Sequence, residues 1–291
     1  MQPFLLESSG IRGRLLRLGP AAEGILSRHA YPAALAGVLA ELLALAGSLS
    51  SLLKYEGVFT LQTSGDGPVA TMVADVTSDG VLRGYAGFDA PRLAAASPIA
   101  APIPQLLGKG HLAFTVDQGE DSERYQGIVA LSGESLADCL QHYFLQSEQS
   151  RTGILVASRE AEAGWRSAAL VLQRLPEEAR QAPDQDEDSW QRAMLLQATC
   201  TTSELLDPNL APRDLLFRLF HEEGVRVFEP RPLVDGCRCS RERLEVVLRS
   251  LPRDDVMALR EDGKVIVTCE FCSKAYDFDS DALESIWGPA P

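Results

Sequence analysis

The chain has 291 residues, of which 45% are hydrophobic and 23% are charged. That composition is typical of a globular protein and excludes a fibrous or wholly disordered chain. Lys and Arg number 27 against 41 Asp and Glu, a formal net charge of −14, which disfavours binding to nucleic acid or to an anionic membrane. The first residues lack the basic start and apolar run of a secretory signal, so we expect a cytoplasmic protein with reduced thiols.

Residues 1–175 predict a large α+β domain in which short β-rich runs surround two helices. The helix expected over Ala33–Lys54 begins after Pro32 and is apolar nearly all round, which predicts a central core helix. A membrane span is disfavoured because Glu41 lies near its middle. A second, amphipathic helix is expected over Ser135–Glu148. The expected strands are Val58–Thr63, Val69–Val76, Val81–Ala86, Leu112–Val116, Gln126–Leu131, Ile154–Ala157 and Ala168–Leu175.

Residues 176–231 predict an acidic linker followed by a helical middle segment. Pro176–Asp188 holds six acidic residues and one basic residue, and we expect it to be solvated up to a helix N-cap at Asp188 or Ser189. Helices expected over Trp190–Thr199 and Pro212–Glu223 are short, and short helices are marginal in water without tertiary packing. We therefore interpret this segment as conditionally folded, with an apolar face that must pack on another surface: Leu215, Leu216, Leu219 and Phe220.

Residues 232–291 predict a small third domain. It should contain a helix over Ser240–Ser250 and a hairpin from Lys264–Thr268 to Ala275–Phe278. So short a stretch, with few large apolar side chains, rarely forms a sufficient core, so a metal or another staple is expected.

Four cysteines in this third domain supply the expected staple, as Cys237-x-Cys239 and Cys269-x-x-Cys272. Two close pairs, one before a helix and one in a hairpin, can place four sulfurs on the tetrahedron that Zn²⁺ prefers. Four thiolates leave no open position for a substrate, and the binding free energy of the metal would also be folding free energy.

Two interpretations of this site remain open from the residues alone. One is a permanent structural zinc site. The other is a redox switch, because zinc-bound thiolates remain open to oxidants and a bridge across the single residue between Cys237 and Cys239 would be strained and oxidising. Joined sulfurs are poor ligands, so oxidation would release the metal and remove the free energy that folds this domain.

Several motifs, in their order along residues 10–278, give the chain a resemblance to a known family. Two details depart from the family pattern: Gly108-Lys-Gly110 stands where three glycines are usual, and Ser9-Gly10 replaces a bulkier start. The motifs are Gly10-Ile-Arg-Gly-Arg14, Gly65-Asp-Gly-Pro68, Arg83-Gly-Tyr-Ala86, Tyr125-Gln-Gly-Ile-Val129, Gln146-Ser-Glu-Gln149, Cys237-Arg-Cys-Ser-Arg241 and Cys269-Glu-Phe-Cys272. On these motifs the chain resembles the heat shock protein 33 family of redox-regulated holdase chaperones.

The resemblance implies an α+β domain, a helical linker and a zinc domain, and an ATP-independent chaperone rather than an enzyme. Its reduced form would hold one Zn²⁺ on the four cysteines and be inactive. Oxidation would form the disulfides Cys237–Cys239 and Cys269–Cys272, expel the zinc and unfold the third domain and then the linker. The oxidised protein would dimerise and hold unfolding client proteins, with the apolar face of the middle segment as a candidate for client binding.

Two other classes of function fit the residues less well. A zinc-ribbon RNA-binding protein should be basic, whereas residues 232–291 carry eight basic and twelve acidic residues. A thiol–disulfide oxidoreductase would place Cys269-x-x-Cys272 at the start of a helix, not within a hairpin. The remaining cysteines, Cys139 and Cys200, are expected to be small buried apolar residues.

Overall fold

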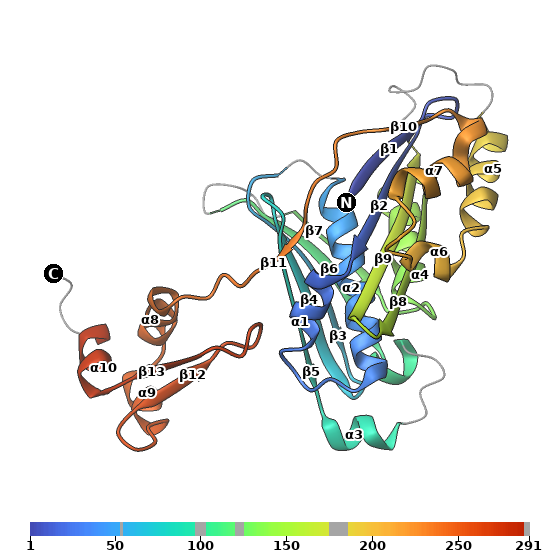
Figure 1. The fold of residues 1–291 in the computed structure, drawn as a ribbon. Helices are drawn as coiled ribbons and strands as arrows, with labels where there is room; N and C mark the ends of the chain where they lie inside the picture. Colours follow the sequence, from blue (N-terminus) through green and yellow to red (C-terminus); the bar gives the residue numbers. More distant parts are fainter. Residues whose placement is uncertain (53–54, 97–102, 120–124, 175–185, 288–291) are drawn as a thin grey trace. The chain divides into compact units, whose positions relative to one another are not determined.

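The computed structural model describes residues 1–52, 55–96, 103–119, 125–174 and 186–287. The chain divides into two compact units, Met1–Asp235 and Gly236–Pro291, and each is described by itself. Both combine helices and strands, so the predicted α+β class is confirmed (Figure 1).

The first unit contains two sheets. Sheet A has the strand order β10-β1-β2-β9-β8 and is antiparallel throughout. Its strands are β1 Gln2–Leu6, β2 Ile11–Leu18, β8 Thr152–Ala161, β9 Gly164–Arg174 and β10 Val225–Val227. Sheet B has the order β11-β5-β4-β3-β6-β7 and is antiparallel except for the pair β11–β5. Its strands are β3 Val58–Gly65, β4 Val69–Thr77, β5 Val81–Phe88, β6 Gly110–Asp117, β7 Tyr125–Ala130 and β11 Val234–Asp235.

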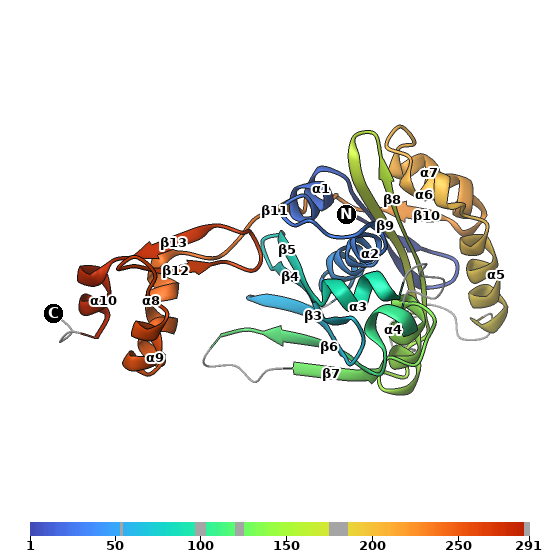
Figure 2. The ribbon, with the colours of Figure 1, turned by 90° about the horizontal axis from the view of Figure 1, so that it is seen from below.

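Helix α2 (Ala33–Ser50) lies between the two sheets and contacts strands of both (Figure 2). Among the described residues it alone has the length and composition of a membrane span, yet 78% of it is buried within the protein. The predicted core helix is therefore confirmed, although it ends at Ser50, and Lys54 falls outside the described residues. The other helices of this region are α1 Pro20–Leu26, α3 Ala90–Ala95, the π-helix Ile103–Leu107 and α4 Leu136–Gln146.

The middle segment covers the face of sheet A that points away from α2. It consists of α5 (Asp186–Ala198), α6 (Thr202–Leu206), α7 (Pro212–Phe220) and a 3₁₀ turn (His221–Glu223), after which β10 pairs with β1. The predicted N-cap at Asp188 or Ser189 is wrong, because the acidic residues from Asp186 onward already belong to α5. The rest of the predicted linker, residues 176–185, lies outside the described residues.

Both faces of sheet A are buried because its strands carry apolar residues on both sides. Ala169 and Val171 of β9 face the core around α2, whereas Leu170 and Leu172 face the middle segment. By contacts the middle segment therefore belongs to the first unit. The division into domains 1–175, 176–231 and 232–291 stays a prediction about which parts fold and unfold together.

The second unit has three helices and one hairpin in its described part. They are α8 Arg241–Ser250, α9 Arg253–Ala258, α10 Ser280–Trp287, and strands β12 Val265–Thr268 and β13 Ala275–Phe278, which pair antiparallel. The predicted helix and hairpin are thus present, and α9 and α10 are additions. The buried core is only Leu248, Val256, Val265, Tyr276, Phe278, Leu283 and Ile286.

Candidate functional site: a four-thiol centre

The second unit brings the four cysteines together. Cys237 and Cys239 directly precede α8, and Cys269 and Cys272 lie in the turn between β12 and β13. Their four Sγ atoms all lie within 4.8 Å of one another. The closest contacts cross the two sequence pairs, with Sγ–Sγ distances of 3.7 Å for Cys237–Cys269 and 3.4 Å for Cys239–Cys272.

Local backbone structure holds both pairs of thiols in place. In the hairpin turn, the N–H of Cys269 donates to the carbonyl of Lys274 at 3.0 Å, and the N–H of Ser273 donates to the carbonyl of Cys269 at 2.8 Å. Ser273 has a φ of 57°, a left-handed conformation that reverses the chain within this short turn. At the other pair, the Ser240 hydroxyl caps α8 by accepting from the N–H of Arg243 at 3.3 Å.

The thiols influence one another's ionisation. Burial opposes ionisation of Cys237, yet hydrogen bonds from the Cys239 backbone and from the neighbouring thiols together lower its pKa to about 7. Burial and the neighbouring thiols raise the pKa of Cys272 to about 12, and burial raises that of Cys269. One thiolate therefore forms easily, while four adjacent negative charges require a cation to offset them.

The donor set fits a single Zn²⁺ ion. Four thiolates are soft ligands, they can surround an ion tetrahedrally, and no position is left for a substrate. Within the described ranges this is the one group of three or more His, Cys, Asp or Glu side chains close enough to share a metal. Because the buried core of the second unit is so small, a bound metal would supply a large part of its folding free energy.

The sequence analysis missed one polar neighbour of this centre. The Tyr276 hydroxyl lies 3.2 Å from Sγ of Cys239, and this contact with Cys239 raises the pKa of Tyr276 to about 12. Tyr276 is seven residues from Cys269 in sequence and carries no metal-ligand signal, so only the hairpin register could have revealed it.

The predicted apolar face of the middle segment is buried against sheet A. Leu215, Leu216 and Phe220 are 0% exposed and Leu219 is 2% exposed. The Phe220 ring stacks on Phe4 of β1 with a centroid distance of 5.8 Å. The sequence-based expectation that these side chains pack on another surface is confirmed, and their role in client binding stays a prediction.

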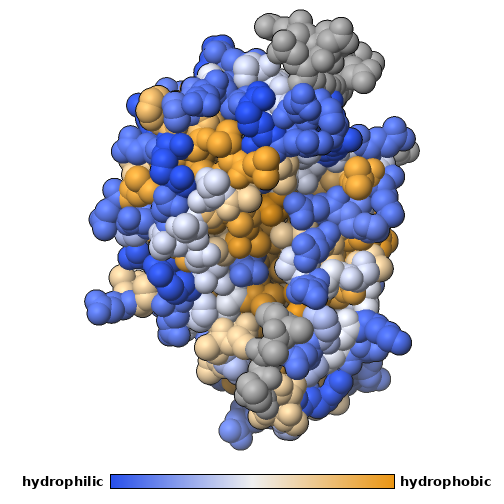
Figure 3. Space-filling model, turned by 90° about the vertical axis from the view of Figure 1, so that its right-hand side faces the viewer, coloured by the Kyte–Doolittle hydropathy of each residue, from blue (hydrophilic) through white to orange (hydrophobic). Residues whose placement is uncertain are grey.

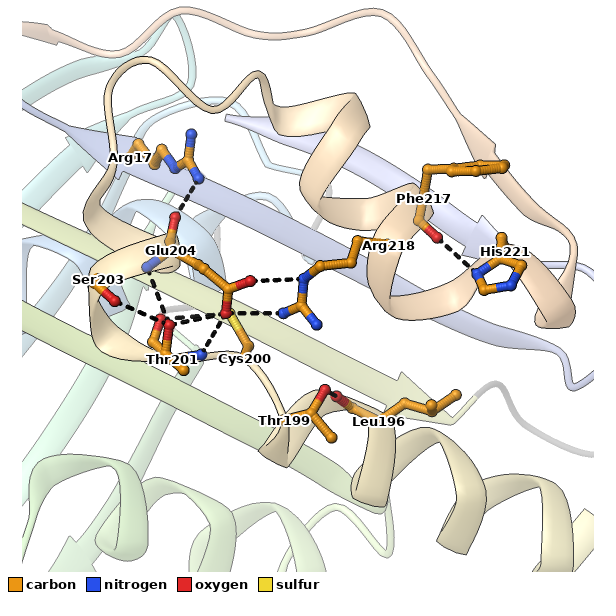
Figure 4. A network of polar contacts seen from close by, with 10 residues as sticks. All are labelled: Arg17, Leu196, Thr199, Cys200, Thr201, Ser203, Glu204, Phe217, Arg218 and His221. Carbon is orange, nitrogen blue, oxygen red and sulfur yellow. Dashed lines mark hydrogen bonds and ion pairs between the residues drawn. The ribbon is translucent and has the colours of Figure 1, made fainter.

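Polar contacts hold the middle segment to sheet A at α6 and join its helices to one another. Arg17 of β2 donates to the backbone carbonyls of Leu205 at 2.7 Å and Glu204 at 2.8 Å, and Glu204 also pairs with Arg218 of α7 at 2.7 Å (Figure 4). Glu223, in the turn after α7, has a buried carboxylate that pairs with Arg192 of α5, and this hydrogen bond lowers the pKa of Glu223 despite burial. Among these residues only Glu204 had a sequence signal, because it forms a capping box with Thr201 at the start of α6.

The outer surface of the middle segment is partly apolar. On the face of the molecule that carries α5–α7, hydrophobic residues form a band between hydrophilic ones (Figure 3). Leu195 of α5 and Phe217 of α7 are 70% and 64% exposed.

The two remaining cysteines lie apart from the four-thiol centre. Cys139 of α4 is 0% exposed and Cys200 is 6% exposed, and burial raises the pKa of the Cys200 thiol. Both surroundings agree with the expected role as small buried apolar side chains.

The fold and the site together define a class of protein: an α+β unit, with short helices laid on one of its sheets, followed by a small unit organised around four thiols. The family model described as Hsp33 protein matches residues 1–279. Curated relatives named 33 kDa chaperonin include those of Caulobacter vibrioides, 41% identical over 95% of this chain and 93% of the relative, and Nitrosococcus oceani, 39% identical over 98% and 92%. The chain belongs to the Hsp33 family of chaperones.

A solved structure shares the fold. The crystal structure of the 33 kDa chaperonin from Thermotoga maritima matches with a TM-score of 0.82 over 98% of this chain and 97% of the other, at 22% sequence identity. The likeness spans nearly the whole chain, including the cysteine-bearing end.

Proposed function

We propose that this protein is a redox-regulated, ATP-independent holdase that binds unfolding proteins under oxidative stress, in the cytoplasm and without catalytic activity. Membership of a chaperone family supports the binding of unfolded proteins. The observation that carries the redox part is the convergence of four thiols within 4.8 Å in a unit with a very small core.

In the reduced state, Cys237, Cys239, Cys269 and Cys272 would hold one Zn²⁺ as thiolates. The bound ion would supply the positive charge that lets all four thiols ionise and the free energy that keeps the second unit folded. The lowered pKa of Cys237 makes it the thiol most ready to bind metal or to react with an oxidant.

Oxidation would proceed by pairs of thiols. Two thiols and one hydrogen peroxide form one S–S bond and two water molecules, so two peroxides oxidise the whole centre. We assign the bonds Cys237–Cys239 and Cys269–Cys272 on the family resemblance and the short sequence spacing. The closest thiol contacts in the structure join Cys237 to Cys269 and Cys239 to Cys272, so the assigned pairing needs a rearrangement, and peptide mapping would distinguish the two patterns.

Loss of metal would then reach the middle segment through the chain that joins the units. Residues 231–235 are held on the first unit by the hydrogen bonds Arg231 N–H to Met1 O at 2.8 Å and Val234 N–H to Gly80 O at 3.0 Å, and by the ion pair Arg28–Asp235. The conformational fluctuations of an unfolded second unit would break these contacts more often. Release of the middle segment would expose the apolar face of sheet A to clients and to a second copy, which gives the oxidised dimer.

A zinc-ribbon RNA-binding protein is the alternative. The acidic composition of residues 232–291 in this chain argues against RNA binding. A salt-dependent shift of labelled RNA by the reduced protein would favour that alternative.

Light scattering of a heat-unfolding client tests the proposal. Reduced, zinc-loaded protein should suppress aggregation weakly, and peroxide-treated protein should suppress it strongly while releasing one zinc per chain. A variant with Cys139→Ala and Cys200→Ala, which keeps the four-thiol centre and buries no new polar group, should switch as the parent protein does. Equal suppression in both redox states, or zinc retained after oxidation, would contradict the proposed switch.

A further inference from the structure

A small cavity of about 230 Å³ lies in the first unit, where the two sheets meet the C-terminal end of α2. Its apolar floor comes from α2, from sheet B and from α4, through Leu49, Phe59, Phe114 and Phe144. It is smaller than the pockets of drug-sized ligands, which start at about 300 Å³. The floor therefore suits one apolar side chain rather than a large ligand.

One wall of the cavity presents a cation. Arg12 of β2 lines it beside Gln173 of β9, and the Nε and Nη2 of Arg12 donate to Oε1 of Gln173 at 2.8 and 2.5 Å. Gln173 is only 6% exposed, and burial lowers the pKa of Arg12. Among the described residues no carboxylate pairs with Arg12, and neither its Nη1 nor the Nε2 of Gln173 has a hydrogen-bond partner. These donors are therefore available to an anion.

The wall beyond α4 presents a carboxylate held in a fixed position. Glu148 accepts hydrogen bonds from the hydroxyls of Tyr143, at 2.8 Å, and Tyr125. Gly127 is required here, because a Cβ at that position would lie 2.5 Å from the Tyr143 hydroxyl. The next residue, Gln149, has a φ of 48°, a left-handed conformation that is uncommon for a residue other than glycine. Within the described part of the chain Glu148 has no basic partner.

Two of the motifs noted in the sequence meet in this wall. Tyr125 and Gly127 belong to Tyr125-Gln-Gly-Ile-Val129, and Glu148 belongs to Gln146-Ser-Glu-Gln149. The redox switch uses neither motif.

We propose that this cavity binds a free α-amino acid with an apolar side chain. The α-carboxylate would bind Arg12 and the amide of Gln173, the α-ammonium would bind Glu148, and the side chain would occupy the floor of Leu49, Phe59 and Phe114. A free amino acid carries both charges on the carbon that bears its one apolar group, whereas a residue inside a peptide carries neither charge and a terminal residue carries one. Charge-assisted hydrogen bonds in a partly buried site are the stronger kind, which favours this ligand over a neutral one.

Calorimetric titration of the full-length, reduced, zinc-loaded protein with L-phenylalanine and L-leucine tests this proposal. We expect saturable binding of one ligand per chain. N-acetyl-L-phenylalanine lacks the ammonium group and L-phenylalaninamide lacks the carboxylate, so each should bind about tenfold or more weakly than L-phenylalanine. No saturable binding of either amino acid at millimolar concentration, or binding of either analogue as tight as that of L-phenylalanine, would overturn the proposal.

Substitution of Glu148 separates the role of its negative charge in ligand binding from its role in the stability of the fold. Glu148→Gln keeps an oxygen that accepts from both tyrosines, so thermal unfolding should be unchanged while L-phenylalanine binds about tenfold more weakly. Glu134→Gln removes the same charge from an exposed position outside the cavity and should leave binding unchanged. If Glu148→Gln bound L-phenylalanine as tightly as the parent protein, the ammonium site would be ruled out. Client protection by the oxidised protein is measured separately, so failure of the redox switch and failure of this site are distinguishable.

Discussion

Gly13 of β2 shows how one residue positions the middle segment. A Cβ at Gly13 would lie 2.0 Å from the Phe4 ring, and that ring stacks on Phe220. The absence of a side chain at Gly13 therefore lets β1 present Phe4 to α7. Gly13→Ala should push the ring away and lower the free energy of unfolding by about 1–3 kcal/mol, the usual effect of overpacking. Urea unfolding of the reduced protein measures this change.

Gly37 of α2 provides the control for that substitution. A Cβ at Gly37 would make only ordinary contacts, 3.4 Å from the Ser158 hydroxyl and 3.7 Å from the Trp165 ring, and its helical backbone accepts alanine. Gly37→Ala should leave stability unchanged or raise it by about 0.5–1 kcal/mol. Equal stability of the two variants would show that the Phe4–Phe220 contact does not depend on Gly13.

Residue types that carry their own chemistry were predictable at this scale. Four cysteines at metal-ligand spacing identify a site wherever the chain places them, and Leu215 and Phe220 follow from helical periodicity. Arg17 was not predictable, because it donates to backbone carbonyls almost two hundred residues away, and any residue type offers such a carbonyl.

At the scale of elements, α7 packs on sheet A through one of its faces, and the opposite face is exposed. Leu216→Ala should leave a cavity against sheet A and lower the opening free energy of α5–α7 by about 2–5 kcal/mol. Phe217→Ala on the same helix removes a side chain that is 64% exposed and should change it by about 0.5 kcal/mol or less. Hydrogen exchange of the backbone amides of α5–α7 measures both. If the two variants exchanged alike, burial against sheet A would not be what holds the segment.

Most of the long elements of the first unit followed from the sequence, with β2 as an exception, and the shortest strands, β10 and β11, did not. The expected strands of sheet B and the hairpin β8–β9 are present because each has enough periodicity of its own. Strands β10 and β11 have three and two residues and exist only because β1 and β5 offer backbone partners. Strand β2 escaped prediction because Arg12, Arg14 and Arg17 interrupt its apolar pattern, although their charged ends find partners at the sheet surface.

At the scale of the whole molecule, the two units should differ in their dependence on metal. The first unit has a large apolar core, whereas the second has seven buried side chains. Chelation of zinc under reducing conditions should therefore make Gly236–Pro291 sensitive to trypsin first and the middle segment next, while the two-sheet core of residues 1–174 stays resistant. Mass spectrometry of the digest identifies the surviving fragment. A second unit that stays resistant after its zinc is removed would contradict the role assigned to the metal.

The antiparallel pairing of β10 with β1 affects how an unfolding polypeptide would bind to sheet A. Val225–Val227 forms the edge strand of sheet A. Release of the middle segment would therefore expose the apolar face of sheet A and would also leave the backbone N–H and C=O groups of Phe4–Leu6 without the strand they pair with. An unfolding polypeptide would then bind in two ways, by apolar contacts with the exposed face and by adding a strand to the open edge of the sheet. The same exposed strand edge would also favour aggregation of the protein. Rapid return of the middle segment to sheet A would limit that aggregation.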